Sequence, residues 1–248
     1  MRNIRIKLAY EGTRYQGWQK QENHENTIQG KLETLISRMC GEEISIQGSG
    51  RTDAGVHALG QVANFHTSCD MAVEEMEHYM NQYLPEDIVV WEVKEVQERF
   101  HSRLNAKGKR YVYRVWNGRV PNVFYRRYAY FMSDVLDLPA MREAAEYLVG
   151  EHDFKSFTSA KKSKKSTIRR IDSIDIRNEG EMITFTFQGN GFLYHMVRIL
   201  VGTLLEVGRG IRSPHTMKEL LKAGNRELAG ELVPGKGLFL EEVFYELN

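Results

Sequence analysis

The sequence has few of the residues and segments that define several classes of protein. It contains only two cysteines, Cys40 and Cys69, among 248 residues. No disulfide framework or cysteine-based zinc site is therefore expected, and a reducing cytoplasm is the default location. No apolar run approaches the roughly 18 residues that a membrane-spanning helix needs. The segment 1–12 alternates and lacks the apolar block of a signal peptide. These features indicate an ordinary soluble globular protein.

Acidic residues are missing from two long segments. The segment 99–127 carries nine lysines and arginines, and the segment 154–171 carries seven. These sixteen are nearly half of the 34 basic residues, so the rest of the chain has 18 basic residues and all 33 acidic ones. Aromatic residues such as Tyr111, Trp116 and Phe124 are interleaved with the first segment. The pattern indicates an acidic body with a nucleic-acid-binding face, and the alternative is a solvated lysine-rich loop over the second segment.

The hydrophobic periodicities predict an α+β protein of two halves. The first half is predicted to have a strand over 4–10, a helix after Thr27, short strands near Ile44 and over 61–65, a helix over 73–83 and a strand over 88–96. The second half is predicted to have a strand over 110–116, a helix over 138–149, a hairpin of 168–176 and 182–187, a helix over 193–207, a short helix opening at Ser213 and a strand over 238–245. The repeated β-α-β-β-α-β order is that of a ferredoxin-like unit. We therefore expect domains 1–105 and 106–248, sharing a central mixed sheet with a cleft between them.

The segment 48–55, GSGRTDAG, places Asp53 two residues after Arg51 in a turn with three glycines. It lacks the third glycine of the dinucleotide fingerprint and the Gly-Lys-Ser/Thr of a phosphate loop. The residues alone leave two interpretations open. One is a hairpin turn with a structural Arg51–Asp53 pair. The other is a carboxylate that a neighbouring guanidinium keeps ionised and that acts as a covalent nucleophile. Together with a nucleic-acid partner, the second interpretation points to chemistry on a nucleoside.

The segment 48–65, GSGRTDAGVHALGQVANF, resembles the signature of the TruA family of tRNA pseudouridine synthases. Four other segments resemble motifs of the same family in the same order. They are YEGTRYQGWQKQ at 10–21, FHSRLNAKGKRYVYRVWN at 100–117, GNGFLYHMVRILVGTLLEVG at 189–208 and GLFLEEVFY at 237–245. Glu11 and Gly235 depart from the family pattern, which commonly has Asp and Ala there. The resemblance covers nearly the whole chain.

The resemblance implies an activity and a set of site residues. Asp53 would attack the target uridine, the N1–C1′ bond would break, and the base would turn and rejoin through C5. Whether the carboxylate attacks C6 or C1′ stays open. Arg51 would hold the flipped-out nucleotide, and Tyr111 would stack on the uracil. Arg198 would pair with Asp53, and Leu238 would pack against the base. The residue patterns alone allow Tyr111 to be an inward-facing strand aromatic.

The implied reaction is an isomerisation, so no redox cofactor, metal or energy donor is expected. The implied partner is tRNA, modified at positions 38 to 40 of its anticodon stem-loop by a cytoplasmic homodimer, with no membrane partner. A non-catalytic RNA-binding protein is the alternative, although such a protein needs no carboxylate among phosphates. The residues expected to contact RNA are His101, Arg103, Lys107, Lys109, Arg110, Lys161, Lys162, Lys164, Lys165 and Arg169.

Overall fold

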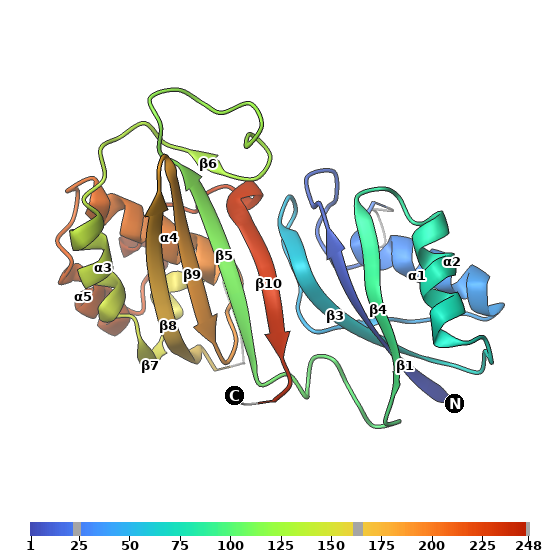
Figure 1. Cartoon of the computed structure of the whole chain (residues 1–248). Coiled ribbons are helices and arrows are strands. Elements are labelled where there is room, and N and C mark those ends of the chain that lie inside the picture. The colour runs from blue at the N-terminus through green and yellow to red at the C-terminus, as the bar shows by residue number, and fades with distance from the viewer. Residues whose placement is uncertain (22–25, 161–165, 247–248) are drawn as a thin grey trace. The chain divides into compact units, whose positions relative to one another are not determined.

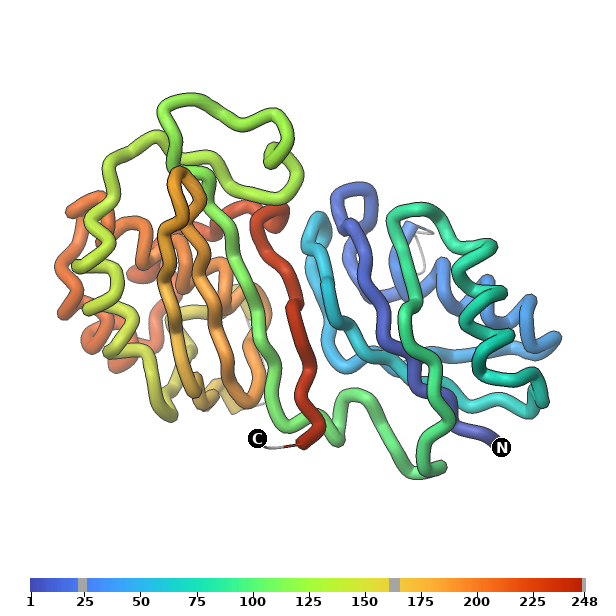
Figure 2. The backbone as a smooth tube through the Cα atoms, viewed as in Figure 1, coloured from blue at the N-terminus to red at the C-terminus, as the bar shows by residue number. Residues whose placement is uncertain are grey.

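The computed structural model describes residues 1–21, 26–160 and 166–246, and the chain divides into two compact units. Unit 1 comprises Met1–Lys107 and Phe239–Asn248, and unit 2 comprises Gly108–Leu238. Figure 1 shows the helices and strands of each unit, and Figure 2 shows the path of the backbone. Each unit combines a β-sheet with helices, which confirms the predicted α+β class.

Unit 1 has the predicted β-α-β-β-α-β order. Its elements are β1 (Arg2–Tyr10), α1 (Ile28–Cys40), β2 (Gln47–Gly48), β3 (His57–Thr67), α2 (Val73–Tyr83) and β4 (Ile88–Val96). β1 pairs antiparallel with β3 and β4, and β2 pairs antiparallel with β3. The strand order β4-β1-β3-β2 is that of a split β-α-β unit. At its other end, β3 pairs in parallel with β10 (Leu238–Phe244).

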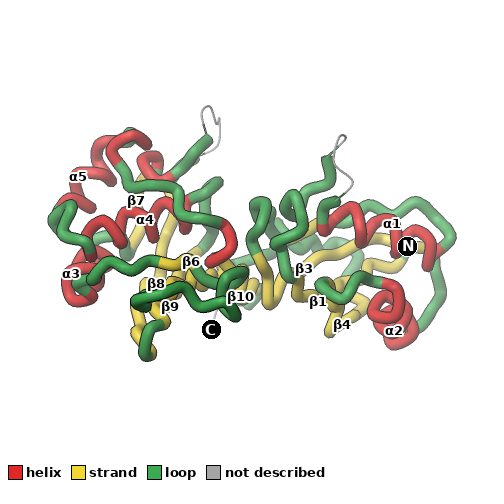
Figure 3. Tube along the Cα trace, turned by 90° about the horizontal axis from the view of Figure 1, so that it is seen from above, coloured by secondary structure: helices red, strands yellow, loops and turns green. Residues whose placement is uncertain are grey.

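Burial along β1 follows the alternation of side chains in a strand. The inward residues are at most 5% exposed, and they are Ile4, Ile6, Leu8 and Tyr10. The helices of unit 1, red in Figure 3, lie beside these strands. α1 begins where the Thr27 side chain accepts a hydrogen bond from the Gly30 N–H, and it ends at Gly41 with φ +69°. The local sequence signals therefore determine both ends of α1.

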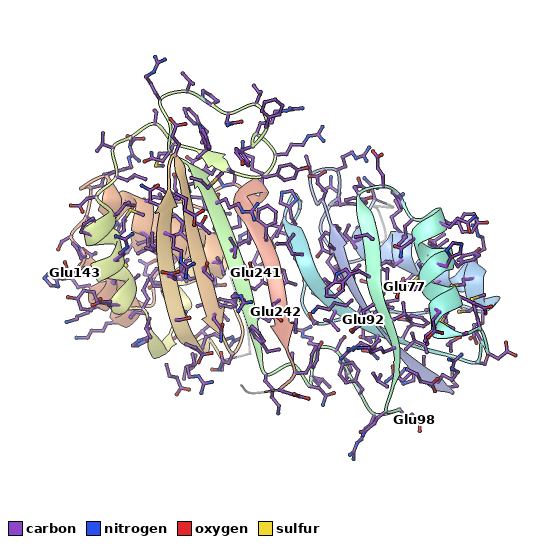
Figure 4. The ribbon with its side chains drawn as sticks, in the orientation of Figure 1. Glu77, Glu92, Glu98, Glu143, Glu241 and Glu242 are labelled. Atoms are coloured by element: carbon purple, nitrogen blue, oxygen red, sulfur yellow. The ribbon has the colours of Figure 1, made fainter. Side chains whose placement is uncertain are left out.

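Charged pairs line the outward positions of β1 and β4. Arg5 on β1 contacts Glu92 on β4 at 2.5 Å, and Lys94 contacts the same carboxylate at 2.7 Å. Figure 4 labels Glu92 together with Glu77 on α2, two of the acids of unit 1. These glutamates are among the acidic residues that lie outside the two acid-free segments.

Unit 2 is built around an antiparallel sheet in the order β5-β9-β8-β7. Its elements are β5 (Gly108–Trp116), β6 (Tyr130–Phe131), α3 (Leu138–Glu146), β7 (Gly150–Asp153), η1 (Lys155–Phe157), β8 (Ile168–Glu179), β9 (Met182–Gly189), α4 (Met196–Gly208), α5 (Thr216–Ala223), η2 (Arg226–Leu228) and η3 (Gly235–Gly237). Gly180, with φ +64°, turns the predicted β8–β9 hairpin. The short strands β6 and β7 are additions to the predicted order.

Several predicted boundaries differ from the structure: the helix expected over 138–149 ends at Glu146, and the strand expected over 61–65 spans His57–Thr67. Two further differences have a local cause. The helix expected over 193–207 begins only at Met196, because His195 has the left-handed φ of 64° and interrupts the helical backbone. The short strand expected near Ile44 lies at Gln47–Gly48 instead, while Ile44 and Ile46 are buried in the preceding loop. Their burial explains why the sequence has apolar residues at these positions although they form no strand.

The last strand groups with the first part of the chain. The predicted domains are 1–105 and 106–248, so the last strand was expected in the second half. In the structure, residues from Phe239 onward belong to unit 1, where Phe239 pairs with His57 and Leu240 pairs with Ala58. Strand β3 therefore receives a partner that is distant in the sequence.

Candidate functional site

The loop between β2 and β3, residues 49–56, carries the candidate nucleophile. Along this loop, Ser49 and Thr52 are buried, Arg51 is exposed and Asp53 is half-buried. The Ser49 N–H donates to the Val62 carbonyl at 2.8 Å, which anchors the start of the loop to β3. The Val56 N–H donates to the Asp53 carbonyl at 3.1 Å, which closes a turn around the aspartate. The loop thus holds Asp53 on a fixed backbone and leaves it partly accessible.

A second loop, residues 11–18, packs against the Asp53 loop. The Trp18 N–H donates to the Thr52 carbonyl at 3.0 Å, and the Gly55 N–H donates to the Tyr15 carbonyl at 3.4 Å. The indole of Trp18 is 2% exposed and covers Gly48, where an added Cβ would lie 2.5 Å from the ring. The segment that resembles the N-terminal family motif is therefore a support for the segment that carries Asp53.

Two glycines of this second loop allow the two backbones to touch. A Cβ on Gly12 would lie 2.0 Å from the Val56 carbonyl oxygen, and a Cβ on Gly17 would lie 2.6 Å from the Thr52 carbonyl oxygen. Gly17 also has φ +88°, a conformation that residues with a side chain rarely adopt. Close approach of backbone, rather than chain flexibility, is the requirement at these positions.

Replacing Gly17 with alanine tests this requirement, and Gly41→Ala is its matched control. Gly41 has a similar φ of +69°, but a Cβ there would meet no atom within 4 Å. We expect Gly41→Ala to lower the free energy of unfolding by about 1–2 kcal/mol, the cost of the left-handed conformation. Gly17→Ala should cost about 1–3 kcal/mol more, because backbone must also move. Urea unfolding of both variants measures the difference, and equal losses would contradict the argument.

Tyr111 lies in unit 2, on β5, where it pairs with Phe187 of β9. Its side chain is only 8% exposed. The Phe192 ring meets it edge to face, with 5.2 Å between the ring centroids. An aromatic ring held in this way on a strand has a fixed orientation, which a stacking platform requires.

Arg198 lies in the first turn of α4 and is half-buried. Its Nε donates to the Val233 carbonyl at 2.7 Å, so the guanidinium is oriented by backbone of the segment before β10. The neighbouring Pro234 carbonyl accepts a hydrogen bond from the Tyr113 hydroxyl at 2.8 Å. Burial raises the pKa of the Tyr113 hydroxyl, and Arg198 partly offsets that rise. Leu238, the first residue of β10, follows this segment and is 5% exposed.

The residues expected to contact RNA occupy several different positions. Arg103 and Lys107 of unit 1 are exposed, while Lys109 and Arg110 are half-buried on β5 of unit 2. The His101 ring accepts the Arg103 N–H at 3.1 Å through Nδ1 and so takes part in a local turn. The remaining expected residues are Arg169, which is half-buried, and Lys161, Lys162, Lys164 and Lys165, which lie outside the described residues.

Within residues 1–21, 26–160 and 166–246, no group of three or more His, Cys, Asp or Glu side chains is arranged to hold a metal ion. Over the same residues, every helix is too short or too polar to cross a membrane.

The family of the chain follows from comparison with known proteins. Residues 7–105 and 144–246 match the family described as tRNA pseudouridine synthase. The chain belongs to this family. The matched ranges contain the Asp53 loop, its supporting loop, α4 and β10.

Three relatives that match nearly the whole chain have names that begin with tRNA pseudouridine synthase A. The chain is 50% identical to tRNA pseudouridine synthase A 1 of Clostridium tetani over 245 residues, 99% of this chain and 100% of that protein. It is 47% identical to tRNA pseudouridine synthase A of Bacillus sp. strain KSM-64 over the same share of both chains. It is 44% identical to tRNA pseudouridine synthase A 2 of Bacillus cereus strain ZK / E33L, over 98% of this chain and 99% of that protein.

Proposed function

We propose that this protein converts uridine to pseudouridine in tRNA, with Asp53 as the nucleophile. The observation that carries the proposal is the Asp53 loop, a tethered backbone with one partly accessible carboxylate, in a chain that belongs to the tRNA pseudouridine synthase family. No finding favours the alternative of a non-catalytic RNA-binding protein. The test is release of tritium from unmodified tRNA labelled at C5 of uridine, since that hydrogen leaves only when the new bond forms.

The chemistry requires one nucleophile and one proton acceptor. The Asp53 carboxylate forms a bond with the uridine, the N1–C1′ bond breaks, and the released uracil turns. A bond then forms between C5 and C1′, the proton at C5 leaves, N1 gains a proton and the carboxylate is released. The product contains the same atoms as the substrate, so the reaction consumes no energy donor and involves no net oxidation.

The remaining site residues would hold the nucleotide during these steps. The target base has to leave its stack before the carboxylate reaches it. Arg51 would hold the flipped-out nucleotide. Tyr111 would stack on the uracil, and Leu238 would pack against the base. Arg198 would pair with the Asp53 carboxylate.

The proposed substrate is the anticodon stem-loop at tRNA positions 38 to 40, the proposed location is the cytoplasm and the proposed assembly is a homodimer. These assignments rest on the resemblance of five segments of the sequence to the family motifs. Mapping pseudouridine in tRNA after incubation with the protein would identify the positions. Sedimentation of the protein alone and with tRNA would identify the assembly.

Binding of tRNA should weaken strongly with salt, because lysine and arginine displace counterions from phosphates. If about six to ten phosphates are contacted, the affinity should fall on the order of a thousandfold between about 50 and 200 mM salt, by the relation for duplex DNA. Replacing Arg103 and Lys107 together with glutamine should reduce the slope by roughly two, since each phosphate contact contributes about one.

The matched control for this measurement is Arg177→Gln. The Arg177 side chain is 73% exposed and pairs with Asp175 at 2.5 Å, and it lies outside both acid-free segments. We expect it to leave the slope unchanged. If the Arg103 and Lys107 substitutions also leave the slope unchanged, these two residues lie away from the bound RNA.

A further inference from the structure

Two buried side chains from other strands hold the loop that carries Asp53. Tyr10 is the last residue of β1 and is 5% exposed, and Gln61 lies within β3 and is fully buried. Both form hydrogen bonds with loop residues next to Arg51 and Asp53. Neither residue has a role in the reaction described above, yet each occupies a buried position where an apolar side chain is the usual choice.

Gln61 uses its whole hydrogen-bonding capacity at the start of the loop. Its Oε1 accepts the Ser49 hydroxyl at 2.7 Å and the Val62 N–H at 3.2 Å. Its Nε2 donates to the Gly50 carbonyl at 2.9 Å and to the Tyr10 hydroxyl oxygen at 3.5 Å. A glutamine amide offers two acceptor lone pairs and two N–H donors, so all four are engaged. A satisfied amide of this kind fixes the geometry of the backbone it contacts.

Tyr10 holds the residue that directly precedes Asp53. Its hydroxyl lies 2.8 Å from the Thr52 Oγ1, and its ring packs against Trp18 with 6.1 Å between the centroids. Burial raises the pKa of the Tyr10 hydroxyl above its ordinary value, so the group keeps its proton. The same oxygen accepts from Gln61, and either hydroxyl of the Tyr10–Thr52 pair can donate to the other. Thr52 is thereby bonded through its side chain to Tyr10 and through its carbonyl to Trp18.

These contacts fix Ser49, Gly50 and Thr52 and leave Arg51 exposed and Asp53 half-buried. We propose that Tyr10 and Gln61 are positioning residues that hold the Asp53 carboxylate at the distance from the target nucleotide that attack requires. The inference rests on the proposed function, since it depends on Asp53 as nucleophile. A misplacement of about 1 Å can lower a rate on the order of a hundredfold without weakening binding.

The test removes one hydroxyl at a time from the Tyr10–Thr52 pair. We expect Tyr10→Phe and Thr52→Val each to lower the single-turnover rate of pseudouridine formation by about 10- to 100-fold at saturating enzyme. The Kd for tRNA should change less than about twofold, because a positioning role affects the reacting geometry and not the phosphate contacts. The double variant should be no slower than the slower single variant, since both changes remove the same hydrogen bond.

Tyr245→Phe is the matched control. Tyr245 also belongs to unit 1, and its hydroxyl donates one hydrogen bond, to the Ser102 carbonyl at 2.7 Å, but it does not contact the Asp53 loop. It should keep the wild-type rate. The inference would be overturned if Tyr10→Phe and Thr52→Val both folded and kept the wild-type rate. It would also be overturned if they bound tRNA more weakly at an unchanged rate, or if the rate losses of the two single variants multiplied in the double variant. A wild-type protein that forms no pseudouridine would instead overturn the proposed function, and this inference with it.

Discussion

Asp53→Asn should abolish pseudouridine formation while tRNA binding stays close to wild type. The amide has nearly the shape of the carboxylate, so the loop retains its backbone hydrogen bonds, but the neutral group cannot act as the nucleophile. The measurement is tritium release from tRNA labelled at C5 of uridine, with the Kd for tRNA measured in parallel. Turnover near that of wild type would remove Asp53 from the mechanism.

Asp70→Asn is the control for this change. Asp70 is the next aspartate along the sequence, lies in the same unit and is exposed. The Asp70→Asn variant also replaces a carboxylate with an amide, but outside the Asp53 loop. We expect its activity and its affinity for tRNA to be unchanged. If both variants lost activity equally, a general effect of charge rather than the position of Asp53 would explain the result.

Tyr111→Phe is expected to separate the two roles that an aromatic residue with a hydroxyl can have. The phenylalanine keeps the ring that would stack on the uracil, and it removes only the group that would accept the proton from C5. If Tyr111 is the general base, single turnover should slow by about a hundredfold or more, with tRNA affinity unchanged. If the hydroxyl has no chemical role, the rate will match that of wild type.

Tyr111→Ala completes the comparison. Loss of the ring removes stacking worth roughly 1–3 kcal/mol and also leaves Phe192 without its edge-to-face partner. We therefore expect the alanine variant to be slower than the phenylalanine variant under saturating enzyme. Equal rates for alanine and wild type would show that Tyr111 does not touch the reacting nucleotide.

The sequence predicted the elements that have strong local signals. α1 follows the capping residue Thr27 with its apolar face at helical spacing, and β1 alternates without interruption, so both were found. β6 and β7 contain two and four residues, too few for a period to be visible. The start of α4 was misplaced because Leu193 and Tyr194 continue the apolar pattern, while the left-handed backbone at His195 has no signature in that pattern.

The candidate site could be predicted only in part, for a physical reason. Asp53 and Arg51 are adjacent in a glycine-rich turn, so the sequence shows them together. The support of that turn is assembled from distant segments, because Tyr10 precedes Thr52 by 42 positions. One signal was available: Gln61 is a polar residue within an otherwise apolar run, and a buried amide requires hydrogen-bonding partners.

The pairing of β10 with β3 has a consequence for the order in which the chain can be completed. Unit 2 is one continuous stretch, Gly108–Leu238, whereas unit 1 requires Phe239 and the residues after it. A ribosome that synthesises the chain from its N-terminus therefore supplies every residue of unit 2 before it supplies the last strand of unit 1. His57, the first residue of β3 after the Asp53 loop, stacks on Phe239 with 4.7 Å between ring centroids. The nascent protein consequently cannot assemble the complete surroundings of the Asp53 loop until translation has passed the whole of unit 2.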